Sequence, residues 1–295
     1  MRIFIRDRMP RDHYIRIGDI NTRYWVEGNS GSSVILIHGL GASAEIWIHN
    51  VSALAMGHRV YVPDLVGFGL TDKPDAVYSS SYMTGFLYDF IEALNIDNAS
   101  LVGMSLGGGL ALQFTLQFPD KVQKLVLADS AGLSRDMTLF MRLATLPFLG
   151  ELMVRPSRAG TALVLRRCVH DPAVIPGDLV ELYYRFSTLP GARRAILSVL
   201  RTNSSFFGGR PEVINPIIRN LGTIKVPSLV IWGMQDRILP VSHAYIARDS
   251  IPDARLRVFD ACGHMPNFER PDEFNASVLN FLNECPSCIR PQDGI

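Results

Sequence analysis

The stretch Gly103-Met104-Ser105-Leu106-Gly107 decides the fold of this chain, because it places a serine between two glycines at the junction of two apolar segments. Residues 99–102 before it are typical of the end of a buried strand, and residues 106–114 after it are typical of a helix packed on nearly all sides. A sharp strand-to-helix turn forces the serine toward a positive φ, where side chains at positions 103 and 107 would collide with neighbouring backbone. We therefore expect Ser105 at the apex of a tight turn.

Three consecutive glycines, Gly107 to Gly109, begin the predicted helix. Each costs about 1 kcal/mol of helix stability relative to alanine, and such a violation is more expected at a functional site than in a scaffold. The pattern also arises by chance at simple turns, so it needs supporting context. A nucleophilic serine needs a base, usually histidine, and a carboxylate that holds this histidine in the right tautomer.

Two downstream strand ends supply these groups. Asp236 follows the β-rich run Ser228–Gly233, and His264 follows the predicted strand at residues 255–260. The order is serine, aspartate, histidine, and each residue comes just after the C-terminal end of a strand. This order and placement are those of the α/β-hydrolase catalytic triad.

Other residues compete for these two roles. Asp129, after the predicted strand 124–128, is an alternative acid, and Asp236 has the alternative role of a turn or N-cap residue. His38 precedes a glycine turn on a different strand, so shaping that loop suits it better than acting as the base. Cys262 lies too close to His264 along the chain to be its nucleophile and is interpreted as a buried small apolar residue. The histidines interpreted as surface or packing residues are His13, His49, His58, His170 and His243.

The complete motif set resembles the α/β-hydrolase family over nearly the whole chain. In order appear His38-Gly39, the segment Asp-Leu-Val-Gly-Phe-Gly at residues 64–69, the serine turn, Trp232-Gly233 and Gly263-His264. A tetrahedral intermediate also needs donors for its oxyanion, each worth about 3 kcal/mol. The resemblance implies that these donors are the backbone N–H groups of Leu40 and Leu106.

Strands alternate with helical stretches, which predicts a mostly parallel eight-stranded sheet with helices on both faces. An antiparallel hairpin over residues 14–17 and 21–27 opens the chain. The other expected strands cover residues 34–38, 59–63, 100–104, 124–128, 228–233 and 255–260, and the expected helices cover 44–55, 82–94, 106–118 and 272–284.

Residues 133–220 break this alternation, since they are rich in Leu, Arg and Met, are helical in period and contain no convincing buried strand. A segment that long between two strands must have a structure of its own. The resemblance identifies it as a helical cap inserted after the sixth strand and lying over the active site. We therefore expect a core at residues 1–132 and 223–295 and a cap at 133–222. The apolar run at 137–149 either packs on the core or forms an apolar wall of the substrate pocket.

The composition is that of a globular enzyme. A chain of 295 residues with 47% hydrophobic content can bury one large core and a subsidiary lobe. The net charge of +1, with charges scattered along the chain, gives no electrostatic case for binding nucleic acid or anionic membranes. There is no apolar run of about 18 residues, and residues 1–8 are too charged for a signal peptide. We expect a cytoplasmic protein without membrane insertion, and the sequence leaves homo-oligomer formation open.

The four cysteines do not make a disulfide scaffold in a chain of this length. Cys285 and Cys288 have CxxC spacing, but no second ligand pair for a tetrahedral metal accompanies them and their context is not thioredoxin-like. They are interpreted as two thiols of an ordinary tail.

The resemblance implies a carboxylesterase-like serine hydrolase that acts on small, largely apolar esters and requires no metal or organic cofactor. His264, oriented by Asp236, is expected to take the Ser105 proton as the hydroxyl attacks a carbonyl, and water then hydrolyses the acyl-enzyme. Serine at the turn argues against two sister chemistries, epoxide hydrolysis and haloalkane dehalogenation, which use aspartate as the nucleophile.

The carbon–carbon bond hydrolases of aromatic-ring degradation are the main alternative, since their length, motif order and cap placement are similar. Their pattern has Asn or Trp before the nucleophile, often Trp after the catalytic histidine, and a cap arginine that contacts the dienoate carboxylate. This chain has Met104, Met265 and Tyr183 there, and Arg185 lies about 200° further around a helix. Ester hydrolysis is therefore favoured.

Lactonase and perhydrolase activity remain further alternatives. A hydrolase-fold ligand receptor is the non-enzyme alternative, because fold alone does not decide function. The intact set of Ser105, Asp236 and His264 argues against it.

Overall fold

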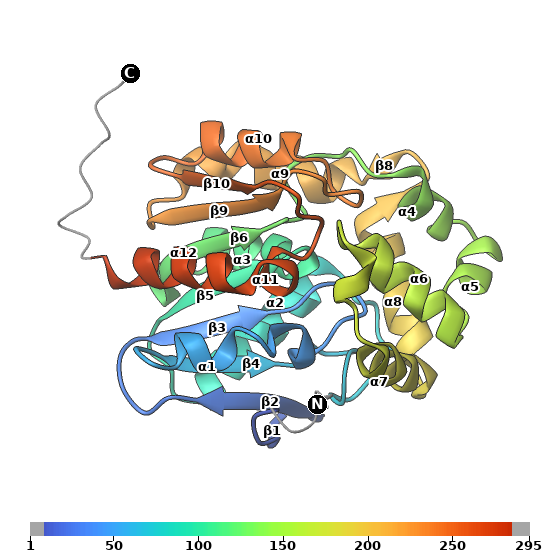
Figure 1. Cartoon of the computed structure of the whole chain (residues 1–295), viewed down its shortest axis with the longest axis horizontal. Coiled ribbons are helices and arrows are strands. Elements are labelled where there is room, and N and C mark those ends of the chain that lie inside the picture. The colour runs from blue at the N-terminus through green and yellow to red at the C-terminus, as the bar shows by residue number, and fades with distance from the viewer. Residues whose placement is uncertain (1–8, 285–295) are drawn as a thin grey trace.

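The predicted sheet is present in the computed structural model, which describes residues 9–284, and helices cover both of its faces (Figure 1). The strand order is β1-β2-β4-β3-β5-β6-β9-β10, with β1–β2 and β2–β4 antiparallel and every other neighbouring pair parallel. The mostly parallel eight-stranded sheet is thus confirmed. Its strands are β1 (His13–Ile17), β2 (Ile20–Glu27), β3 (Ser33–Ile37), β4 (Arg59–Pro63), β5 (Ala99–Met104), β6 (Val122–Ala128), β9 (Ser228–Gly233) and β10 (Arg255–Phe259).

Each central strand buries both of its faces, which explains why these strands are continuous apolar runs. Ile35 and Leu101 face one hydrophobic cluster, whereas Val34 and Val102 face the other. The first cluster is covered by α2 (Ser80–Ala93), α3 (Leu106–Gln117) and α10 (Ser242–Ser250), and the second by α1 (Val51–Leu54), α11 (Pro266–Glu269) and α12 (Pro271–Asn283).

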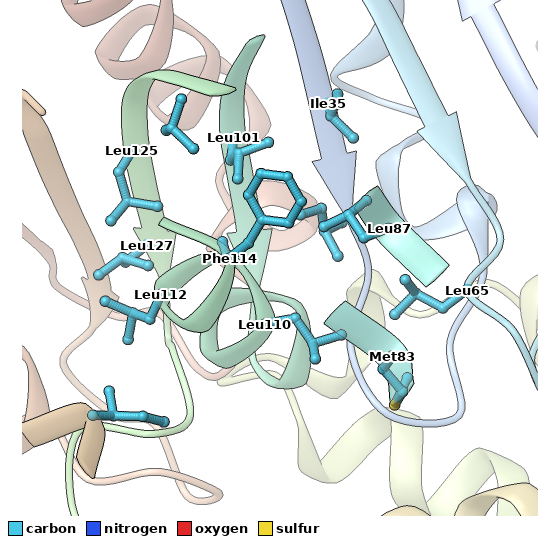
Figure 2. Packing of buried hydrophobic residues seen from close by; sticks show 14 of the residues in the cluster. Ile35, Leu65, Met83, Leu87, Leu101, Leu110, Leu112, Phe114, Leu125 and Leu127 are labelled. Carbon is cyan, nitrogen blue, oxygen red and sulfur yellow. The ribbon is translucent and has the colours of Figure 1, made fainter. Parts of the chain in front are cut away.

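Helix α3 lies at the centre of the first cluster. Figure 2 shows Leu110 and Phe114 of this helix among Leu87 of α2, Leu101 of β5 and Leu125 of β6. All five side chains are almost fully buried. Burial of this kind contributes about 1.5–3 kcal/mol for each large apolar side chain, so packing offsets the low helix propensity of the three leading glycines.

One predicted helix, at residues 44–55, is wrong in detail. The segment forms a 3-10 turn at Ala44–Trp47 and the separate short helix α1. Its ends are held by long-range contacts, since the Ala44 amide donates to Asp64 Oδ1 at 2.7 Å and the Asn50 amide group donates to the Asn267 carbonyl at 3.0 Å. Helix α10 was not predicted, because its buried face consists of small residues, Ala244 and Ala247, beside His243.

Residues 133–222, hereafter the helical insertion, lie between β6 and β9, and their helices α4 to α8 form a lobe at one end of the molecule, whereas α9 lies against α3 of the core (Figure 1). The insertion is helical as expected, apart from one two-stranded hairpin. The domain boundaries at its two ends stay predictions. Its elements are α4 (Leu139–Ala144), α5 (Leu149–Met153), α6 (Arg158–Arg167), α7 (Gly177–Thr188), α8 (Ala192–Asn203), β7 (Ser204–Ser205), β8 (Gly208–Gly209) and α9 (Pro211–Asn220).

Within residues 9–284, none of the helices has both the length and the apolar character needed to cross a membrane. Two of the sequence interpretations concern residues outside this range. They are the interpretation of Cys285 and Cys288 as ordinary thiols and that of residues 1–8 as too charged for a signal peptide.

The serine turn has the predicted strained geometry. Ser105 has φ 54° and ψ −119°, a conformation that L-residues rarely adopt. A Cβ atom at Gly103 would lie under 3.0 Å from the Gly107 carbonyl oxygen, and one at Gly107 would lie under 3.0 Å from the carbonyl oxygens of Ile37 and His38. The glycines are therefore required by the close approach of α3 to β5 and to the end of β3.

We predict that Gly107→Ala lowers the free energy of unfolding by about 1–3 kcal/mol or more, because the added methyl group meets rigid backbone. Gly85→Ala is the matched control, since Gly85 lies in α2 with nothing within 4 Å of its Cβ position. The control is expected to gain about 0.5–1 kcal/mol from helix propensity. Urea denaturation measures both changes, and equal effects of the two substitutions would contradict the close approach.

Candidate active site

Ser105 is held by backbone hydrogen bonds at the C-terminal ends of two neighbouring strands. Its amide donates to the Ala128 carbonyl at the end of β6 at 2.9 Å. Its own carbonyl accepts from the amides of Gly108, Gly109 and Ala131. These bonds fix the turn against β6, so the strain at Ser105 is maintained by its surroundings.

Asp236 and His264 are brought together, as the sequence predicts. His264 Nδ1 lies 2.7 Å from Asp236 Oδ2, and both side chains are almost fully buried. Asp236 Oδ1 accepts from the amides of Ile238 at 2.7 Å and Leu239 at 3.1 Å, which fixes the carboxylate. The bond to Asp236 places the histidine proton on Nδ1 and leaves Nε2 able to accept one.

Ser105 and His264 are not joined by a hydrogen bond in the described part of the chain. Such contacts are often long in enzymes without substrate and tighten only in the reacting complex. The two residues follow β5 and β10, with β6 and β9 lying between these strands in the sheet.

The loop that carries His264 is bound to the end of α6 in the helical insertion, which the sequence did not predict. The His264 amide donates to the Cys168 carbonyl at 2.7 Å. The carboxylate of Glu269 accepts from the amide of Gly263 at 2.5 Å and from that of His170. A Cβ atom at Gly263 would lie 2.7 Å from the His170 nitrogen, so glycine is needed where the two segments cross. The insertion therefore positions the histidine directly.

Asp129, the alternative acid, lies in the same cluster but makes no hydrogen bond to His264 among the described contacts. Its Oδ1 accepts from the Gly233 amide at 3.1 Å, whereas its buried Oδ2 has no hydrogen-bond partner in the described residues. Burial and the nearby charge of Asp236 raise the pKa of the Asp129 carboxyl well above its ordinary value. The geometry therefore favours Asp236 as the partner of His264, with Asp129 as a neutral neighbour.

One atom each of Asp129, Asp236 and His264 lies within 4.8 Å of the others, which is the spacing of a metal-binding set. The atom that His264 offers to this set is Nδ1 or Nε2, and Nδ1 is already hydrogen-bonded to Asp236. A metal ion could therefore be bound by His264 only through Nε2.

The loop after β3 packs against the serine turn. A Cβ atom at Gly39 would lie 3.2 Å from the Ser105 Cβ atom, and the Ala42 amide closes the loop by donating to the Gly39 carbonyl at 3.2 Å. Leu40 lies within this loop. Leu106 is the first residue of α3, where amides have no acceptor within the helix and the helix dipole favours negative charge. The oxyanion role of these two amides stays a prediction.

The comparisons agree with this geometry. A family model described as the alpha/beta hydrolase family matches residues 34–277. The chain belongs to this family. The match begins in β3 and ends in α12, so it includes all the strands that carry the serine, aspartate and histidine.

Several relatives of this hydrolase have names that state an activity. A 2-hydroxy-6-oxo-6-(2'-aminophenyl)hexa-2,4-dienoic acid hydrolase of Metapseudomonas resinovorans is 33% identical over 279 residues, which cover 92% of this chain and 91% of the relative. The structure of a meta-cleavage product hydrolase from Pseudomonas fluorescens is 30% identical with a TM-score of 0.79, covering 92% of this chain and 97% of that one. A putative lipase from Acinetobacter baumannii is 26% identical with a TM-score of 0.80, covering 92% and 90%.

His38 supports the loop of the hydrolase that contains Leu40. Its Nδ1 lies 2.8 Å from the Gly39 carbonyl, and its Nε2 accepts from the Leu65 amide at 2.9 Å. These partners require a neutral ring protonated on Nδ1. Full burial also lowers the pKa of His38, so the side chain shapes the loop, in agreement with the sequence interpretation.

Behind this loop lies a buried charge network that the sequence did not reveal. Arg23 of β2 is 2% exposed, and its guanidinium donates to Glu45 at 2.8 Å, to Asp64 at 3.0 Å and to Asp12 at 2.7 Å. Ser43 Oγ donates to Glu45 Oε2 at 2.6 Å, which connects the network to the loop. Arg23 therefore holds together the two segments that follow β3 and β4.

We predict that Asp129→Asn becomes more stable relative to the wild type as the pH rises from about 4 to 7. A carboxyl that keeps its proton when folded but ionises when unfolded makes the free energy of unfolding fall with rising pH, and asparagine lacks this effect. The difference should grow by up to about 1.4 kcal/mol per pH unit until the raised pKa of Asp129 is reached.

Urea denaturation of both proteins at several pH values measures this difference. The carboxylates of Asp236 and Glu269, which face Asp129, are present in both proteins, so the comparison isolates the carboxyl of Asp129. A stability difference that does not change with pH would mean that Asp129 is ionised in the folded protein.

We predict that Arg23→Met lowers the free energy of unfolding by about 3–5 kcal/mol, because Glu45 and Asp64 then stay buried without their cation. Arg16→Met is the control, since the side chain of Arg16 is 71% exposed and pairs with exposed Asp19. Its expected loss is below about 1 kcal/mol. Similar losses for both variants, measured in urea, would contradict a central role of the network.

Proposed function

We propose that this hydrolase cleaves carboxylic esters of small, largely apolar substrates through an acyl-enzyme on Ser105. In this proposal His264, oriented by Asp236, takes the proton of the Ser105 hydroxyl as the oxygen attacks the ester carbonyl. The same proton then passes from His264 to the leaving alcohol, and a water molecule repeats the sequence on the acyl-enzyme.

The amides of Leu40 and Leu106 are proposed to donate to the oxyanion of the tetrahedral intermediate. The argument rests on the packing of the Gly39 loop against Ser105 and on the position of Leu106 in the first turn of α3. Backbone donors held by packing need no rearrangement as charge develops, so they stabilise the transition state more than the ground state.

The observation that carries the choice of an ester is Tyr183 of α7. Carbon–carbon bond hydrolases have in their pattern an arginine at this position, which contacts the dienoate carboxylate. Tyr183 is neutral and 6% exposed, and its hydroxyl lies near Ser43 and Glu45. Burial, together with the negative charge of Glu45, raises the pKa of this phenol. A neutral phenol beside a carboxyl group gives no charge compensation to an anionic substrate, whereas a neutral ester needs none.

Arg185, two residues further on, does not replace the missing cation. Its side chain is 60% exposed and pairs with Glu181 at 3.3 Å. It lines a cavity of about 540 Å³ beside Arg23 and Leu70, and the lining of this cavity among the described residues includes neither Ser105 nor His264.

Apolar side chains near the serine support an apolar substrate. Leu40 and Leu106 are only partly buried and pack at the edge of the first hydrophobic cluster, as does Ile196 of α8. The Cβ position of Gly41 lies 3.5 Å from Ile196, so the insertion brings an apolar side chain to the oxyanion loop. Such side chains are typical of the walls of a small-molecule site.

Carbon–carbon bond hydrolysis is the second candidate, because the names of the relatives favour it. The dienoic acid hydrolase of Metapseudomonas resinovorans and the meta-cleavage product hydrolase of Pseudomonas fluorescens both align with over nine-tenths of this chain. The putative lipase of Acinetobacter baumannii supports ester hydrolysis at lower identity. The relatives thus match the second candidate more than the first, and the residue at position 183 opposes it.

We predict that the purified protein hydrolyses a short p-nitrophenyl ester faster, by kcat/KM, than a dienoate ring-fission product. A lactone is assayed in parallel. Ser105→Ala is expected to lose at least about 1,000-fold in ester turnover, because no nucleophile remains. A serine-directed phosphonate should label the wild type once and leave the variant unlabelled.

Each contrary outcome has a distinct meaning. Faster turnover of the dienoate replaces the ester proposal by the second candidate. Full esterase activity in Ser105→Ala contradicts the assignment of the nucleophile. Binding of esters without turnover by the wild type would favour a ligand receptor.

A further inference from the structure

The helical insertion carries a charge that the net charge of the chain conceals. Residues 133–222 contain 12 arginines, no lysine and six acidic residues, a formal charge of +6, whereas the rest of the chain carries −5 and the whole carries +1. Several of these arginines are neutralised locally, as in the pairs of Arg201 with Glu151 and of Arg158 with Glu181. Others, among them Arg155, Arg166 and Arg167, are exposed.

Large apolar side chains are exposed on the same part of the insertion. Phe148 is 89% exposed and Leu152 is 66% exposed, although residues of this kind are usually buried. These side chains belong to α4, to α5 and the residue before it, to α6 and to the turn between β7 and β8, and α5 lies at the end of the lobe away from the sheet in Figure 1. The exposed members are Leu139, Phe148, Leu152, Leu163, Val164, Phe206 and Phe207.

The outer elements are joined to one another. The Arg167 guanidinium of α6 lies over the Phe140 ring of α4, 5.5 Å from its centre, which is within the distance of about 6 Å for a cation–π contact. The Gly209 amide donates to the Arg135 carbonyl at 2.9 Å, and this bond ties the β7–β8 hairpin to the segment before α4. We call the exposed residues of α4, α5 and α6, with the exposed arginines beside them, the outer face.

Basic and apolar side chains are exposed together on α6. Leu163, Val164, Arg166 and Arg167 are exposed, while Leu165 between them is buried. A helix advances 100° per residue, so Leu163 and Arg167 lie opposite Leu165, and Val164 and Arg166 lie on its two flanks. Residues 152–170 contain four arginines and no acidic residue. The face therefore presents positive charge and apolar surface together.

We propose that the outer face docks on the surface of a membrane that contains anionic lipids. Apolar side chains enter the boundary between headgroups and acyl chains, while arginines bind lipid phosphates, and each basic residue near such a surface adds attraction. This proposal does not depend on the proposed ester hydrolysis. It revises the expectation, drawn from the small net charge, that the protein does not bind anionic membranes, because the positive charge is concentrated in one segment.

The side chains of the outer face argue against a second copy of the chain or a nucleic acid as its partner. A second copy of the chain, placed symmetrically on the same face, would bring like-charged arginines together. A nucleic acid would pair with the arginines but would give Phe148 and Leu152 no apolar environment. Anionic lipid satisfies both kinds of side chain.

The test is co-sedimentation of the full-length protein with vesicles of phosphatidylcholine alone and of phosphatidylcholine mixed with phosphatidylglycerol. Binding is expected to the mixed vesicles only and should weaken as salt is added. The double variant Arg166→Gln with Arg167→Gln should bind about 25-fold more weakly, since each arginine contributes about fivefold. Phe148→Ser with Leu152→Ser should also weaken binding.

Met56→Ser and Arg257→Gln are the matched controls, because both residues are exposed and lie outside the insertion. They should bind like the wild type, and circular dichroism should show that every variant is folded. Absence of binding, or equal binding to both kinds of vesicle, would overturn the proposal. So would a dimer that dissociates in Phe148→Ser with Leu152→Ser while no vesicle is bound, because the face would then be an interface between copies.

Discussion

The site depends on one close approach, where the first turn of α3 lies against the end of β3 at Gly107. No side chain fits at this position, because backbone carbonyls of Ile37 and His38 occupy its Cβ site. The approach places the Ser105 hydroxyl, the first amides of α3 and the Gly39 loop beside one another. If α3 moved outward to admit a methyl group, the serine and its proposed oxyanion donors would separate. Glycine at position 107, which weakens the helix, is thus the condition for the site.

A second close approach fixes Asp236 and His264, the proposed acid and base. A Cβ atom at Gly233 would lie under 3.0 Å from the Gly263 carbonyl, and one at Gly263 would meet the backbone of residues 168–170. The loops that follow β9 and β10 are therefore packed against each other and against the end of α6. Because the Cys168 carbonyl accepts the amide of His264, the helical insertion is part of the framework that orients the histidine. A shift of α6 would change the position of the base.

The sequence predicts what local pattern controls. Strands buried on both faces are continuous apolar runs, so β4 and β9 have the predicted bounds, and the loop that carries Asp236 follows β9 as predicted. Contacts between distant segments leave no such pattern. Arg23 and Asp64 are 41 residues apart, and nothing near Arg23 marks it as buried. The break in the predicted helix at 44–55 has the same origin, because it depends on a hydrogen bond between Ala44 and Asp64.

The carboxyl groups around His264 bear on the charge of the substrate. Asp236 is fixed by the histidine and two amides, Glu269 is bound to amides, and Asp129 carries an unpartnered oxygen among the described residues. Because Asp129 is neutral, an anionic substrate would be repelled by the charges of Asp236 and Glu269, and this repulsion would need an opposing cation in the site. The residue at position 183 is a tyrosine, and the nearby Arg185 is exposed and paired with Glu181. A neutral carbonyl compound avoids the repulsion, so electrostatics and the residue at position 183 both favour an ester.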